Sequence, residues 1–179
     1  MAPENVGKVV PGWEGRTFED FQLGDIYNHP FGKTVTEADN HWLTLMTQNV
    51  AKTHVDSNFA TRTEFAEPLV NSTLILALVV GQSTIDLSMN VFANLGWDEV
   101  RLPHPVFVGD TIYSRSKVMV TRESVSRPTM GLVTVASEGF NQDGKIVIRF
   151  KRTFMIYKNG HLPQNAHKVP DISTLPDME

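Results

Sequence analysis

An unbroken apolar run lies near the middle of the chain, where residues 74–80 read LILALVV. Asn71 and Ser72 stand just before it, and both residue types favour the N-cap of a helix. A helix that is apolar around its whole circumference must be buried around its whole circumference. We therefore predict a central helix that begins at Asn71 or Ser72 and is covered on all sides.

A second helix is predicted over residues 37–48. Thr36 precedes it, and Asp39 follows three residues later, which is the spacing of a capping box with Asp in place of Glu or Gln. Three apolar residues then recur at the i, i+3, i+4 spacing of one helical face: Trp42, Leu45 and Met46. This spacing is typical of an amphipathic helix.

The second half of the chain alternates as strands do, over residues 90–103, 110–123, 131–142 and 145–158. Asp143-Gly144 joins the last two segments and is a strong signal for a tight hairpin. In the last strand Ile146, Ile148 and Phe150 share one face, whereas Arg149 and Lys151 point the other way. The predicted fold class is α+β, with one long helix wrapped by a mostly antiparallel sheet.

The two ends of the chain lack a sustained period. Residues 1–15 are rich in glycine and proline and are predicted to form an N-terminal arm. Residues 159–179 contain three prolines, so we expect a C-terminal tail that is either disordered or draped over a partner. The single domain is expected over residues 16–158.

Composition narrows the class of protein. With 179 residues, 41% hydrophobic and 20% charged, the chain has the balance of one soluble globular domain. The absence of cysteine excludes disulfides, cysteine zinc sites and a cysteine nucleophile. A net charge of −4 argues against a broad nucleic-acid surface, which needs clustered lysine and arginine. No apolar run approaches 18 residues and no signal peptide is evident, so we expect a cytoplasmic protein that is not in a membrane.

Six motifs in this order carry a resemblance to a known family: TEADNHWLTLMTQN with THVD, EFAEPLVNSTLILAL, NLGWDEVRLPHPVFVGDTIYSRSKV, RESVSRP and NQDGKIVIRFKRTFMI. Together they resemble the MaoC-like (R)-specific enoyl-CoA hydratases and dehydratases over roughly residues 15–158. Within that family the similarity is greatest to the branch that acts on itaconyl-CoA or mesaconyl-CoA. The resemblance implies a single hotdog fold, an acyl-CoA substrate, hydro-lyase activity, and no metal or organic cofactor.

Hydration of a 2-enoyl thioester needs a base for water, a proton source for Cα, and donors for the thioester oxygen. The resemblance implies that His54 is the base; otherwise it is an ordinary loop histidine. The family's usual aspartate, five residues earlier, is Asn49 here, and an amide cannot exchange protons at neutral pH. We therefore expect His54 to remove the proton from water and return it to Cα, as a syn addition permits. Asn49 either orients the water or thioester, or serves as a helix C-cap.

The resemblance also implies an oxyanion hole at the start of the central helix. The backbone N–H groups of Ser72 and Thr73 should point out of its positive end, next to Asn71. The Ser72 hydroxyl is a further candidate for contact with the substrate. The alternative is a helix cap with no ligand.

Two pairs of residues are candidates for holding the rest of the substrate. Arg122 and Arg127 form a local cationic patch that fits a coenzyme A phosphate or an acyl carboxylate, or else a solvated hairpin end. Trp97 and Arg101 either line the acyl pocket or have structural roles, Trp97 as a core residue and Arg101 in an ion pair. In the resembling family this strand borders the substrate tunnel.

Other candidate groups have simpler roles. Asp56 either orients His54 or caps the short segment that follows, and capping is favoured. Glu37 and His41 are spaced as a metal pair, but no further ligands are evident, so no metal site is predicted. A hotdog thioesterase and a non-catalytic acyl-CoA binding or regulatory protein stay as alternatives. The open sheet edge and half-built pocket of one hotdog protomer predict a homodimer, or a higher oligomer built from dimers.

Overall fold

Six antiparallel strands form the sheet of the computed structural model, which describes residues 8, 10–164, 166–168 and 175. Five strands follow the order β1-β4-β5-β6-β3, and the short β2 pairs separately with β4. The strands have these bounds: β1 Ile26–Asn28, β2 Lys33–Thr34, β3 Val91–Arg101, β4 Thr111–Glu123, β5 Met130–Phe140 and β6 Ile146–Tyr157. The four long strands coincide closely with the four predicted ones.

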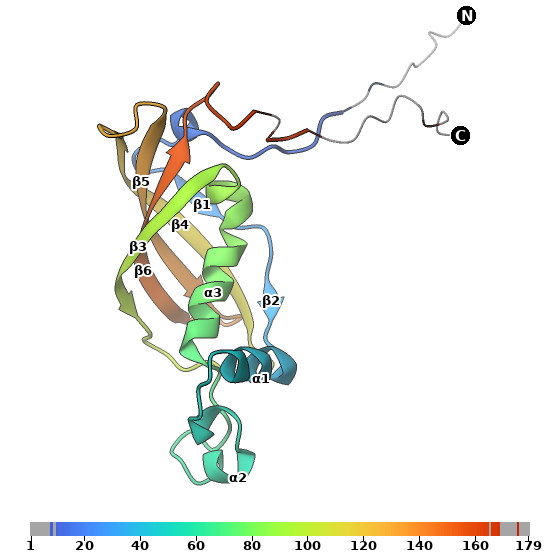
Figure 1. Ribbon diagram of the computed structural model, residues 1–179. Helices are drawn as coiled ribbons and strands as arrows, with labels where there is room; N and C mark the ends of the chain where they lie inside the picture. The colour runs from blue at the N-terminus through green and yellow to red at the C-terminus, as the bar shows by residue number, and fades with distance from the viewer. Residues whose placement is uncertain (1–7, 9, 165, 169–174, 176–179) are drawn as a thin grey trace, which may run out of the picture.

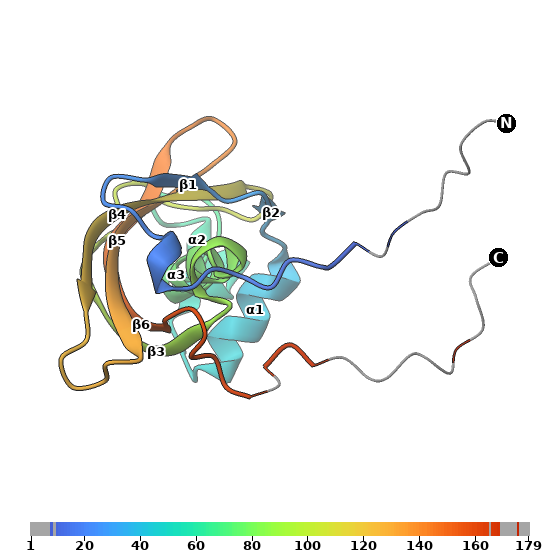
Figure 2. The ribbon, with the colours of Figure 1, turned by 90° about the horizontal axis from the view of Figure 1, so that it is seen from above.

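The helices lie on one side of this sheet. They are α1 Glu37–Met46, α2 Ser57–Ala60 and α3 Ser72–Gln82, with short helical turns at Phe18–Asp20, Lys52–His54 and Thr84–Ser88. The sheet curves around α3, and α1 lies near the N-terminal end of α3, on the side away from the sheet (Figures 1 and 2). The predicted α+β architecture, one long helix wrapped by an antiparallel sheet, is therefore confirmed.

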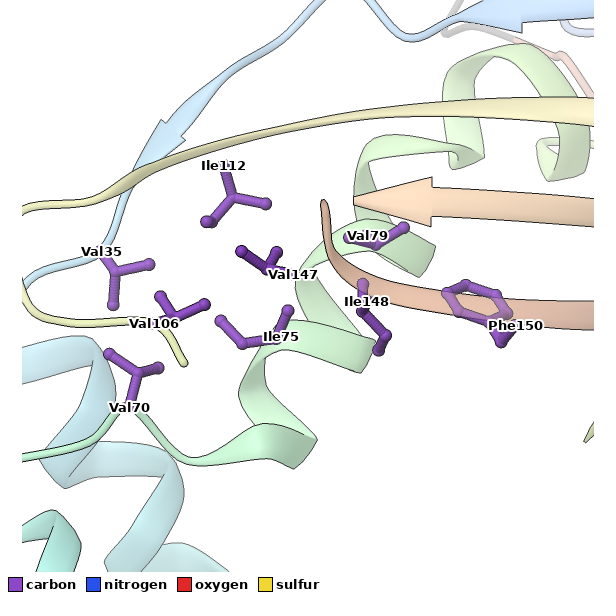
Figure 3. Close-up of a cluster of buried hydrophobic side chains, with 9 residues drawn as sticks. All are labelled: Val35, Val70, Ile75, Val79, Val106, Ile112, Val147, Ile148 and Phe150. Carbon is purple, nitrogen blue, oxygen red and sulfur yellow. The ribbon is translucent and has the colours of Figure 1, made fainter. Parts of the chain in front are cut away.

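The main core lies between α3 and the concave face of the sheet (Figure 3). It is built from these side chains: Val35, Val70, Ile75, Val79, Val106, Ile112, Val147, Ile148 and Phe150. Gly139 of β5 permits the close approach, because a Cβ there would lie 2.6 Å from Val79 Cγ2. A side chain larger than hydrogen at residue 139 would push helix and sheet apart.

The expectation that the central helix is covered on all sides is wrong for the single chain. Only Ile75, Val79 and Gln82 of α3 are buried, whereas Ala77 and Gly81 are exposed. The sheet covers one side of the helix, and the described part of the protomer leaves the opposite side open. An apolar helical face is thus left for another surface to cover.

The second predicted helix exists but ends earlier than predicted. It stops at Met46 rather than residue 48, and Gln48 has a positive φ of 56°. The predicted capping box is confirmed, since Asp39 N–H donates to Thr36 Oγ1 at 3.2 Å. The apolar positions point outward, with Trp42 75% exposed. The inward face is polar instead and contains Asn40 and Thr44, both buried.

The predicted hairpin between β5 and β6 is confirmed, with a slightly longer loop. Asn141 N–H donates to the Lys145 carbonyl at 3.0 Å, and three residues connect the two. Gly144 has a φ of +74°, the left-handed conformation that this turn requires. The side-chain oxygen of Asn141 also accepts from Asp143 N–H and Lys145 N–H.

The predicted arm and tail lie partly outside the described residues. Trp13 Nε1 donates to the Ile85 carbonyl at 2.9 Å, and Asn90 Nδ2 donates to the Glu14 carbonyl at 2.9 Å. The last part of the arm therefore packs on the segment that follows α3. Among the described helices, none is both long and apolar enough to cross a membrane.

Candidate active site

The buried amide of Asn40 joins three segments at the N-terminal end of α3. Its Nδ2 donates to the backbone carbonyls of His54 at 3.0 Å and Leu69 at 3.2 Å. Its Oδ1 accepts from the backbone N–H of Asn71 at 2.8 Å. One side chain from α1 therefore sets the position of the His54 loop against the start of α3.

The imidazole of His54 is held in one tautomer. Its Nδ1 lies 2.8 Å from the carbonyl oxygen of Leu69. A carbonyl oxygen can only accept, so Nδ1 must carry the proton. In the neutral ring Nε2 then has a free lone pair, which is the form that a general base requires.

His54 lines a cavity of about 350 Å³. Most of the lining is apolar and comes from the His54 loop, α3 and the segment after β3: Phe65, Leu69, Val70, Ile75, Leu102 and Val106. Val70, Ile75 and Val106 are also core residues, so the cavity adjoins the cluster drawn in Figure 3. The polar side chains in the lining are His54, Ser72 and His104.

The first turn of α3 presents one unused backbone donor to this cavity. Asn71 is the N-cap, and its Oδ1 accepts from Thr73 N–H at 3.0 Å and Thr73 Oγ1 at 2.7 Å. The Thr73 amide is therefore already paired. Ser72 is exposed and lines the cavity, and its N–H has no partner among the described residues. That N–H and the positive end of the helix can bind a developing negative charge.

Asn49, at the position of the family's usual aspartate, is absent from the cavity lining. Its Oδ1 accepts from Ala51 N–H at 2.9 Å, and its own N–H donates to the Thr44 carbonyl at 3.0 Å. Both contacts are within the connection between α1 and the His54 loop. The side chain is thus engaged in shaping the turn.

The favoured role of Asp56 is confirmed, since it caps α2 by accepting from Phe59 N–H at 2.9 Å. Glu37 and His41 lie 4.0 Å apart on α1. Within the described part of the chain no cluster of three or more possible metal ligands occurs.

The basic candidates lie away from the cavity in this protomer. Arg122 is at the end of β4, and Arg127 is in the turn that follows β4. The guanidinium carbon of Arg127 lies 4.8 Å from the ring centre of Phe92 in β3. The 13-residue length of β4 places that turn roughly 40 Å from the strand's first residue, which lies near the cavity. Arg122 and Arg127 are therefore not brought together with His54 within one chain.

Trp97 and Arg101 also lie outside the cavity lining. Trp97 is 45% exposed on the edge strand β3. Arg101 Nη1 donates to the Val100 carbonyl at 2.8 Å. Neither the core role nor the ion-pair role considered for them is observed in the described chain.

His104 was missed by the sequence reasoning. It lies between Pro103 and Pro105 and lines the same cavity as His54. The only local signal was a histidine between two prolines after a predicted strand. Its hydrogen-bond partner, the carbonyl of Ile146, is 42 residues away in the chain.

Comparisons with known proteins agree with this picture. Residues 9–172 match the family model described as Mesaconyl-CoA hydratase. The chain is 31% identical over 160 residues to Mesaconyl-CoA hydratase of Cereibacter sphaeroides, covering 89% of this chain and 46% of that protein. It is 33% identical over 159 residues to Beta-methylmalyl-CoA dehydratase of Chloroflexus aurantiacus, covering 88% of this chain and 45% of that protein.

Solved structures show the same fold. A MaoC domain protein dehydratase from Chloroflexus aurantiacus superposes with a TM-score of 0.80 at 30% identity, covering 91% of this chain and 46% of that one. A Mycobacterium tuberculosis protein described as a double hotdog fold gives a TM-score of 0.76 at 24% identity, covering 92% and 52%. The hotdog fold implied by the sequence motifs is thereby confirmed.

The chain spans about half the length of the curated relatives that it matches. The match nevertheless extends over α1, α2 and α3, the His54 loop and every long strand. This chain belongs to the mesaconyl-CoA hydratase family of MaoC-like hotdog proteins.

Proposed function

We propose that this protein is a hydro-lyase that adds water reversibly to a short, carboxylated 2-enoyl-CoA of the mesaconyl-CoA or itaconyl-CoA type. The observation that carries the proposal is the fixed tautomer of His54. Its Nδ1 is held on the Leu69 carbonyl, and the ring lines a cavity that also contains the free end of α3. A base and an oxyanion donor therefore meet in one apolar cavity.

In the proposed mechanism His54 Nε2 accepts a proton from water as the water oxygen bonds to Cβ. The π electrons move through Cα to the thioester oxygen, and Ser72 N–H with the positive end of α3 stabilises the resulting negative charge. The imidazolium then returns its proton to Cα on the same face. Dehydration follows the reverse path, and the scheme needs neither a metal nor an organic cofactor.

The thioesterase alternative is less well supported. A hotdog thioesterase generally needs an acidic residue to activate water, and no carboxylate occurs between Leu74 and Thr84. None of the residues that line the cavity has a carboxylate either. The binding or regulatory alternative is weakened by the unpartnered base that His54 presents.

The proposed active form is a homodimer or a higher oligomer built from dimers. The open side of α3 exposes Ala77 and Gly81, and the unpaired edge strand β3 exposes Phe92, Leu95 and Trp97 beside charged residues. Such an edge needs a cover. Light scattering that finds a stable, active 20 kDa monomer would refute this.

The function is tested by incubating the protein with crotonyl-CoA, mesaconyl-CoA and itaconyl-CoA. Mass spectrometry measures gain of water, and a thiol reagent measures free coenzyme A. A hydrated thioester without thiol release supports the hydro-lyase. Thiol release without a hydrated product indicates a thioesterase, and tight binding without either product indicates a binding protein.

A further inference from the structure

His104 is held as firmly as His54, although its side chain is exposed. Its Nδ1 lies 2.8 Å from the Ile146 carbonyl oxygen, so Nδ1 carries the proton and donates. Pro103 and Pro105 restrict the backbone on both sides, because proline fixes its own φ and confines the residue before it to extended conformations. The ring is therefore oriented before any ligand arrives, and Nε2 has no partner in the described part of the chain.

The cavity contains few groups that can meet an anion. Apart from His54 and His104, the residues that line it are apolar except for Ser72. A carboxylated acyl group would place a negative charge against these apolar walls, in addition to the charge that develops on the thioester oxygen. Burying that carboxylate is costly unless it is paired with a cation or a hydrogen-bond donor. Arg101 is close in sequence but donates to the Val100 carbonyl.

Only one of the two histidines can pair with the carboxylate of the acyl group. His54 must be neutral to accept a proton from water, so a positive charge on it would stop the reaction. His104 is outside the proton-transfer scheme and is free to be an imidazolium when a carboxylate binds. Its charged form donates from both ring nitrogens.

We propose that His104, through Nε2, binds the free carboxylate of the acyl group and selects carboxylated over uncharged acyl thioesters. This rests on the proposed function insofar as an acyl-CoA must occupy the cavity.

The test uses saturated thioesters, which bind without being hydrated. Dissociation constants of succinyl-CoA and butyryl-CoA are measured by calorimetry. The variants are His104→Gln, which is neutral, and His104→Lys, which restores a cation. His161→Gln is the matched control, because His161 is exposed and outside the cavity.

We expect His104→Gln to lower the preference for succinyl-CoA over butyryl-CoA by roughly tenfold, the worth of one charge-assisted hydrogen bond. His104→Lys should recover most of the preference, and His161→Gln should match the parent chain.

Three results would overturn the inference: an unchanged preference in His104→Gln, an equal loss of affinity for both thioesters, or no binding of either thioester by the parent chain. The last would also count against the proposed function. Carboxylate selectivity that depends on His104 in a chain without hydratase activity would refute the proposed function alone.

Discussion

His54 Nδ1 and the carbonyl oxygen of Leu69 lie 2.8 Å apart, and this hydrogen bond determines which nitrogen of the ring is basic. Replacement of His54 removes the proposed base and leaves the Leu69 carbonyl in place. We expect His54→Ala and His54→Gln each to lower kcat by about 10²- to 10⁴-fold, because neither side chain can accept a proton from water. Near-native rates for His54→Ala on every enoyl-CoA tried would show that His54 is an ordinary loop residue.

Asn49 should matter much less to turnover. Its Oδ1 supports a turn through Ala51 N–H, and it does not line the cavity. We expect Asn49→Ala to reduce kcat far less than His54→Ala, by loosening the His54 loop. Asn49→Asp retains an acceptor for Ala51 N–H and should keep hydratase activity, as measured by initial rates. A loss equal to that of His54→Ala would indicate a direct role in proton transfer.

The buried histidine His29 should make the stability depend on pH. His29 Nδ1 donates to Asp86 Oδ2 at 2.8 Å, and Nε2 lies 3.0 Å from Ser116 Oγ. Burial lowers the pKa of His29 from 6.5, although Asp86 partly opposes this. The unfolded chain then binds the extra proton more readily, so stability is full above 6.5 and declines as the pH falls below it.

Thermal unfolding at a series of pH values measures this effect. The midpoint temperature should fall between neutral and mildly acidic pH, before most carboxylates titrate. His161→Gln, which changes an exposed histidine, should show the same slope of midpoint temperature against pH as the parent chain. An equal slope in His29→Gln would mean that another group is responsible.

The loop between β5 and β6 should tolerate only residues that accept a positive φ. Gly144 has a φ of +74°, and nothing lies within 4 Å of a Cβ placed there. Gly144→Val should therefore destabilise the fold by about 1–2 kcal/mol through backbone strain alone. Gly144→Asn is the matched control and should cost less, since asparagine adopts this conformation more readily. Equal unfolding midpoints for the valine variant and the parent would contradict this.

Local patterns were sufficient to predict much of the fold. The strand boundaries, the capping box of α1 and the β5–β6 hairpin depend on neighbouring residues, so period and turn chemistry revealed them. The orientation of α1 depends instead on Asn40, whose partners lie 14 to 31 residues away. Those polar contacts turn the apolar side of the helix outward, and no local pattern encodes that choice.

The candidate site was predictable to a similar extent. His54 and Ser72 were found through motifs, and the structure brings them into one cavity. Arg122 and Arg127 were grouped with them on charge, but the length of β4 separates them within one chain. His104 was missed because its neighbours in space come from β6 and the His54 loop. The buried cation Arg152, held by Asn94 Oδ1 at 2.7 Å, was hidden for the same reason.

Because the amide of Asn40 contacts the backbone of both His54 and Asn71, it links the His54 loop to the first turn of α3. A small rotation of α1 would displace the His54 loop and the first turn of α3 together. The outer side of α1 exposes Trp42, Leu45 and Met46. Contact with this side would act on the position of the helix without touching the cavity. A surface that packs against these side chains would therefore limit movement of the His54 loop relative to α3.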